Sequence, residues 1–229
     1  MEPAPSVDLA LSGADLSWVE PPEPKRLAGM HRRAVVAAAL QVPYPVFSLV
    51  VIGGSYLGVV DPGSVAVLAG EVLLSLPGLV AFMYWFYGAY RLAQDMSAYP
   101  LDTTPGWGVA QFFIPIVSLF MPYQRMREIE EVNASGASGT LLDEPAGGHL
   151  LALWWAAWVA GLILGGIVGG VEGLDTSGEA VVTVGLLAVG SGVLSNVMTA
   201  LVALHIDAGQ QGLSQALWDA EPLAPEEWA

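Results

Sequence analysis

Cysteine is absent from the 229-residue chain. Its absence excludes disulfides, thiolate metal sites, cysteine nucleophiles and cysteine palmitoylation. A metal or haem site would therefore depend on carboxylates and on the three histidines, His31, His149 and His205. We expect neither a metal nor a cofactor, because histidines at helix ends are ordinary interfacial residues and no ligand spacing flanks these three.

Basic residues are also scarce, since seven lysines and arginines stand against 22 acidic residues, for a net charge of -15. This balance argues against nucleic acid or an anionic lipid surface as a broad partner. Catalytic signatures are missing as well: the sequence has no glycine-serine nucleophile elbow, no HExxH motif and no Walker loop. We therefore expect a protein that is not an enzyme.

Apolar residues dominate what is present: 54% of the chain is hydrophobic and 13% is charged, compared with about 25% charged in soluble domains. Four apolar stretches are long enough to cross a hydrocarbon core of about 30 Å. They cover residues 34–60, 64–90, 150–171 and 180–206. Pro43 and Pro45 should kink the first of them. Aromatic residues near the end of the second stretch predict an interfacial belt of Tyr84, Trp85, Phe86, Tyr87 and Tyr90.

The predicted fold is an all-α polytopic membrane helical bundle. It comprises a mobile cytoplasmic tail at 1–33, a membrane helical domain at 34–206 and an acidic cytoplasmic tail at 207–229. Residues 128–148 are rich in small and acidic residues, which predicts a flexible loop.

The segment 104–127 differs from the four apolar stretches, because Pro115 and Pro122 interrupt it while no residue from Trp107 to Tyr123 is charged. Each proline removes a backbone donor and clashes with the preceding helical turn, so the freed carbonyls need protein or water. We predict a re-entrant or interfacial helix here, in addition to four transmembrane helices. The alternative is a fifth transmembrane helix.

The positions of the basic residues predict the topology. They precede the first apolar stretch, follow the second at Arg91, and follow the proline-broken segment at Arg125 and Arg127, whereas the loops at Asp61 and at 172–179 contain acids and no base. Because positive residues remain on the cytoplasmic side, both termini should be cytoplasmic. Four spans satisfy this rule only if residues 107–123 enter and leave on the same side.

Several short motifs occur together along the chain: Trp85-Phe86, Tyr90-Arg91, Thr104-Pro-Gly-Trp107, Phe112-Phe-Ile-Pro115, Pro122-Tyr-Gln124, Trp154-Trp155 and Trp158. This combination resembles the domain-of-unknown-function family 4328 over residues 76–211. The resemblance implies a multi-pass protein of the bacterial cytoplasmic (inner) membrane. It implies no activity.

Five polar and aromatic residues near the predicted cytoplasmic face form a candidate pocket for a small anion or a lipid headgroup: Arg91, Trp107, Gln111, Gln124 and Arg125. Arginines and side-chain amides are suitable donors for an anion. In the alternative interpretation, the arginines only anchor the topology by extending to the interface.

A second group of residues predicts close helix packing. Gly161, Gly165 and Gly169 recur at four-residue spacing and so place one small-residue face against a neighbouring helix. Asn196 should pack against another helix, because a bare amide in hydrocarbon is costly; alternatively it lines a path together with Ser195 and Thr199.

These observations favour a non-catalytic membrane binding or scaffold subunit. Its expected partners are the lipid bilayer and a membrane protein or a second copy of the chain, bound through the glycine face, with no nucleic acid. The alternative is a small transporter, channel or lipid-handling protein that works through residues 104–127, since broken helices supply oriented dipoles for ions or headgroups.

Overall fold

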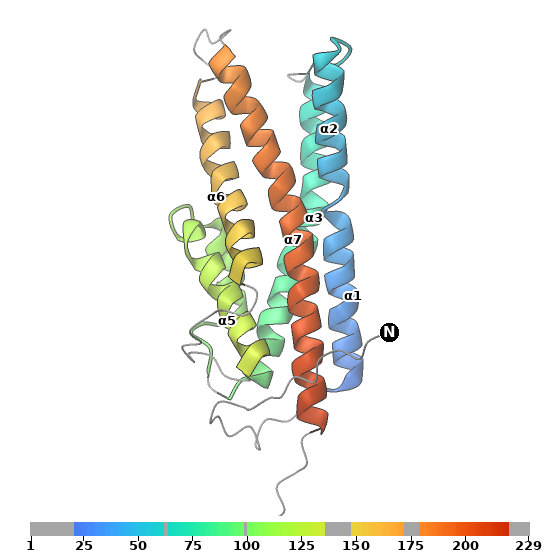
Figure 1. Ribbon diagram of the computed structural model, residues 1–229, viewed down its shortest axis with the longest axis vertical. Helices are drawn as coiled ribbons and strands as arrows, with labels where there is room; N and C mark the ends of the chain where they lie inside the picture. Colours follow the sequence, from blue (N-terminus) through green and yellow to red (C-terminus); the bar gives the residue numbers. More distant parts are fainter. Residues whose placement is uncertain (1–20, 62–63, 99, 136–147, 172–178, 220–229) are drawn as a thin grey trace, which may run out of the picture. The chain divides into compact units, whose positions relative to one another are not determined.

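The computed structural model describes residues 21–61, 64–98, 100–135, 148–171 and 179–219. These residues form helices and contain no strands (Figure 1). The order is α1 (Pro24–Leu40), α2 (Pro43–Tyr56), α3 (Val65–Met96), α4 (Pro105–Ala110), η1 (Gln111–Phe113), η2 (Val117–Leu119), α5 (Met121–Ser135), α6 (Gly148–Val171) and α7 (Glu179–Asp219).

The chain divides into two compact units. Unit 1 comprises Met1–Met30, Tyr87–Ala146 and Ile206–Ala229, and unit 2 comprises His31–Phe86 and Gly147–His205. Helices α1, α3 and α7 contribute residues to both units. The candidate site lies in unit 1, and the predicted packing residues lie in unit 2.

Within the described residues, four helical stretches are long and apolar enough to cross a membrane, which agrees with the four predicted apolar stretches and indicates a membrane protein. They are Pro24–Tyr56, Val65–Met96, Gly148–Ile167 and Gly185–Asp219. The proline-broken segment is not among them, because its longest helix before α5 has six residues. Six residues rise about 9 Å, far less than the roughly 30 Å of a hydrocarbon core. A fifth helical span is therefore not found in the described chain.

The first span is broken where the prolines predicted it. In unit 2, α1 ends at Leu40 and α2 begins at Pro43, whose missing N–H cannot continue the helical ladder. Gln41, in the break, donates a side-chain hydrogen bond to the carbonyl oxygen of Gly78 at 3.0 Å. A Cβ on Gly78 would lie 2.8 Å from the carbonyl oxygen of Leu40, so the close approach of α3 to the break requires glycine.

Aromatic rings form the core of unit 2. Phe82 lies 5.6 Å from Trp85 and 6.2 Å from Trp154, measured between ring centroids, and all three side chains are buried. The indole Nε1 of Trp154 donates to the Thr199 hydroxyl at 2.9 Å and so joins α6 to α7. The predicted interfacial belt is thus wrong for Trp85, which is fully buried and packs against Phe82 in the core.

Phe86 and Tyr90 are also fully buried, so only two members of the predicted belt are exposed. These are Tyr84 and Tyr87. The guanidinium of Arg33 lies 4.4 Å from the ring centroid of Tyr84, a cation-π contact between α1 and α3.

Two predicted boundaries differ from the structure in unit 1. Helix α5 continues to Ser135 through the first part of the predicted loop, because Met126, Ile129 and Val132 recur every three residues and are fully buried. Helix α7 continues to Asp219, so residues 207–219 are helical rather than part of a tail.

The predicted tail at 1–33 is likewise helical from Pro24 onward. Residues 1–20 and 220–229, which complete the two predicted tails, lie outside the described part of the chain, as does most of the predicted loop, residues 136–147.

Candidate functional site

The proline-broken segment is built from local signals in its sequence. Thr104 caps α4, because its hydroxyl oxygen accepts a hydrogen bond from the backbone N–H of Trp107 at 3.3 Å, and Pro105 occupies the first turn. Beyond η1, Ile114 is extended, as expected for a residue before proline. The Ser118 hydroxyl then donates to the carbonyl oxygen of Pro115 at 2.8 Å. The result is a series of short helices in place of one long one.

The segment has an inward and an outward face. Gly108, Gln111, Phe112 and Ser118 are buried, and no residue from 103 to 124 is charged. The outward side chains are large and apolar, with exposed fractions of 54% for Trp107, 63% for Phe113, 76% for Ile116 and 55% for Phe120.

Polar contacts fasten the two ends of this segment to α3. The Gln94 side-chain amide donates to the carbonyl oxygen of Thr103 at 2.7 Å. At the other end, the Tyr90 hydroxyl donates to Glu128 Oε2 in α5 at 2.5 Å. The segment therefore begins and ends beside the last turns of α3.

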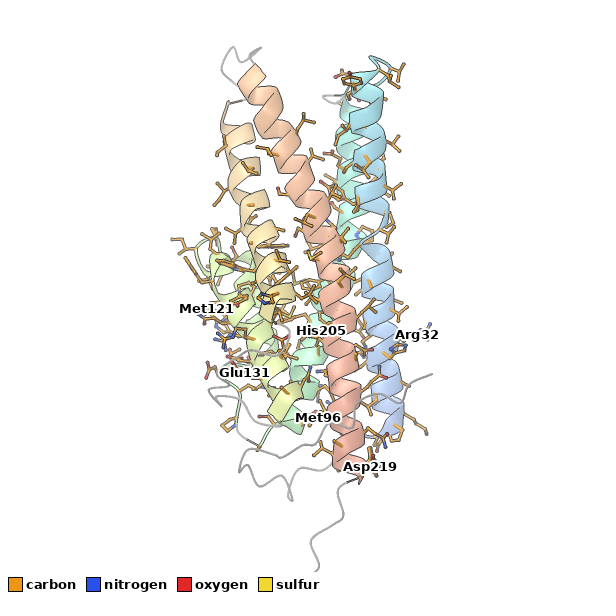
Figure 2. All side chains as sticks on the ribbon, in the orientation of Figure 1. Arg32, Met96, Met121, Glu131, His205 and Asp219 are labelled. Atoms are coloured by element: carbon orange, nitrogen blue, oxygen red, sulfur yellow. The ribbon has the colours of Figure 1, made fainter. Side chains whose placement is uncertain are left out.

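A buried polar network links α3 to α5 (Figure 2, where Met121 and Glu131 mark α5). Arg125 forms an ion pair with Glu128, and its guanidinium also lies 3.5 Å from a carboxylate oxygen of Asp102. The exposed fractions of Arg125 and Glu128 are only 6% and 8%. The arginine charge is thus already balanced within unit 1.

Burial raises the pKa of Glu128 above its ordinary value, because desolvation outweighs the opposing effects of Tyr90 and Arg125. For Arg125, desolvation alone would lower the pKa, but the contacts with Tyr90 and Glu128 raise it further above the usual arginine value. Arg125 therefore remains charged, and the Glu128 carboxylate binds a proton more readily than an ordinary glutamate does.

The five residues of the predicted anion pocket differ in burial. Gln111 and Arg125 are buried, and Gln111 Oε1 and Arg125 Nε have no hydrogen-bond partner within the described chain. Arg91, Trp107 and Gln124 are exposed. Because Glu128 neutralises Arg125, this arginine has little charge left to balance that of an anion.

Sequence analysis missed Tyr90, Asp102 and Glu128 as members of one network. Glu128 was assigned to a flexible loop, and Tyr90 to an interfacial belt. The three-residue spacing of Met126 and Ile129 could have extended the helix through Glu128. The pairing with Tyr90, 38 residues away, carries no local signal.

The end of α7 is fastened to both neighbouring helices of unit 1. The Asn133 side-chain amide in α5 donates to the carbonyl oxygen of Ile206 at 3.2 Å, and the Gln210 amide donates to the carbonyl oxygen of Ala89 in α3 at 2.8 Å. A Cβ on Gly209 would lie 2.8 Å from Asn133 Nδ2, so α5 and α7 approach closely here.

The predicted packing residues lie in unit 2, where α6 and α7 run side by side (Figure 1). A Cβ on Gly161 would lie 3.5 Å from the Ser191 hydroxyl oxygen of α7, whereas a Cβ on Gly165 would meet no atom within 4 Å. The surroundings of Gly169 lie outside the described part of the structure. The Asn196 amide donates to the carbonyl oxygen of Gly192 at 2.9 Å, within its own helix.

Histidines and carboxylates do not converge on a metal site: the described residues contain no group of three or more such side chains that could hold an ion. His149 and His205 are both exposed.

Residues 57–208 match the family described as domain of unknown function (DUF4328). The chain belongs to this family. The match confirms the resemblance carried by the glycine-tryptophan, proline and paired-tryptophan motifs, although it begins earlier than residue 76. The DUF4328 region includes the proline-broken segment and the contact between Tyr90 and Glu128. No curated protein and no solved structure matches the chain.

Proposed function

We propose that this DUF4328 protein is a non-catalytic, multi-pass protein of the bacterial cytoplasmic membrane that acts as a binding or scaffold subunit. Its partner is a transmembrane helix, from another membrane protein or from a second copy of the chain. The four apolar helices support the membrane location. The open space beside Gly165 carries the proposal of a partner helix.

Gly161 and Gly165 are one helical turn apart and therefore share a face of α6. At Gly161 this face is close to α7, but one turn further the space beside Gly165 is open and the residue is exposed. Lipid or another helix must fill such space in a bilayer. A glycine at this position lets the backbone of a second helix approach closely, which favours a helix.

The test is Gly165→Leu, which fills the open space without touching Ser191. Cross-linking in membranes and native mass in detergent should both show loss of association. Gly166→Leu is the matched control, because Gly166 also faces open space but points about 100° away around the helix. Unchanged association in Gly165→Leu would contradict the proposal.

We further propose that both termini are cytoplasmic and that the proline-broken segment enters and leaves on one side. Ala98 is buried, so a cysteine at the exposed Pro100 is a better reporter of the loop before the segment. Single cysteines at Pro100 and Ala137 should react from the cytoplasm, and those at Asp61 and Ser177 from outside. Reaction of Pro100 and Ala137 from opposite sides would contradict this topology.

The alternative function is a transporter, channel or lipid-handling protein that works through residues 104–127. The buried, unpaired Gln111 Oε1 and Arg125 Nε favour it, because such atoms can bind water or a polar ligand. Flux and lipid-transfer assays on reconstituted wild type, Arg91→Ala and Pro115→Ala test this function. An inactive wild type would exclude it.

A further inference from the structure

Residues 104–120 carry four large, exposed apolar side chains on short helices that pack against one another. Trp107 lies on α4, Phe113 on η1, and Ile116 and Phe120 flank η2; α4 packs against η1, and η1 packs against η2. More than half of each of these four side chains is exposed. Exposed apolar groups gathered in this way indicate an interaction surface.

The contacts to α3 locate the two ends of this segment along the helix. Gln94 donates a hydrogen bond to Thr103, and Tyr90 donates one to Glu128, so both ends of the segment are attached to the last turns of α3. At this point the apolar run of α3 gives way to Arg91, Gln94 and Asp95. Such a change from apolar to polar residues marks the boundary between hydrocarbon and headgroups.

The backbone of the segment suits the same depth. Three short helices interrupted by Pro115 leave carbonyl groups that lack intrahelical donors. These groups can be hydrated in the headgroup region, whereas the hydrocarbon core offers them no donor. The aromatic residues of the outward face are also those that favour the interface.

We propose that residues 104–120 lie in the plane of the membrane as an interfacial anchor, with Trp107, Phe113, Ile116 and Phe120 inserted at the boundary between headgroups and acyl chains. The ligand of this surface is the lipid leaflet, and the inference rests on the proposed membrane location. Because residues 103–124 carry no charge, insertion does not require anionic lipid and does not weaken with salt.

The test uses the absence of native cysteine. Ile116→Cys and Phe113→Cys, each labelled with an environment-sensitive fluorophore, are reconstituted in phosphatidylcholine vesicles with and without phosphatidylglycerol. The lipids carry a nitroxide quencher either near the headgroup or near the end of the acyl chain. We expect greater loss of fluorescence with the nitroxide near the headgroup, equal in both lipid mixtures and unaffected by salt.

Two further positions calibrate depth. Leu162→Cys, at an exposed site of α6, should be quenched more strongly by the deep nitroxide, and Asp219→Cys, at the exposed end of α7, should be quenched by neither. Labels at Ile116 and Phe113 that behave like the label at Asp219, or like that at Leu162, would overturn the interfacial anchor. An unquenched Leu162 label would instead refute the proposed membrane location.

Discussion

Replacing Glu128 by alanine is expected to destabilise the protein strongly, because it removes the acceptor of both Tyr90 and Arg125. Arg125 would remain charged at 6% exposure without its main partner. Removing one member of a buried ion pair costs about 3–5 kcal/mol. Asp102 lies 3.5 Å from Arg125, but its side chain is 77% exposed and compensates only weakly, so we expect the loss to remain within this range.

The assay is the free energy of unfolding from a sodium dodecyl sulfate titration in mixed micelles. The double variant Arg125→Met with Glu128→Leu is the control, since it removes both charges of the buried pair together and costs the Tyr90 hydroxyl its hydrogen bond to Glu128. Its expected loss is about 1 kcal/mol. A Glu128→Ala variant as stable as wild type, or a double variant as unstable as the single one, would refute the reasoning.

The same network predicts that the stability of the folded protein depends on pH. Because burial raises the pKa of Glu128, the folded protein binds this proton more tightly than the unfolded chain. The stability from this group is therefore fully present below the ordinary carboxyl pKa of 4.5 and is lost as the pH rises through the folded value. Glu128→Gln should remove this dependence. A stability difference between wild type and Glu128→Gln that is constant from acidic to neutral pH would contradict it.

Two further predictions concern helix contacts and use the same titration. Gly209→Val should displace Asn133 and cost about 1–3 kcal/mol, whereas Gly212→Val, where a Cβ meets no atom within 4 Å, should cost much less; equal losses would contradict the close contact. Thr199→Val removes the acceptor of the Trp154 indole and should cost about 1 kcal/mol. In a Trp154→Phe background, where the indole donor is already gone, Thr199→Val should add little, and a fully additive loss would show that the hydrogen bond contributes nothing.

The candidate site was only partly predictable. The segment 104–127 was recognised because its prolines and its lack of charge are local properties of the sequence. The pairing of Arg125 with Glu128 was not, because it requires α5 to continue into the predicted loop, and the hydrogen bond from Tyr90 comes from a different helix. Whether an arginine can bind an anion depends on the carboxylate beside it, and only the continuation of α5 past residue 127 brings the Glu128 carboxylate one helical turn from Arg125.

The sequence by itself determined the four apolar helices, the break before Pro43 and the membership of the DUF4328 family. These features depend on composition, on the missing proline N–H and on short motifs, which act within a few residues. Only the tertiary structure decided that Trp85 is a core residue, that α5 continues through Glu128, and that Gly165 faces open space. Each of these depends on which side of a helix meets a neighbour, and packing between distant segments determines that side.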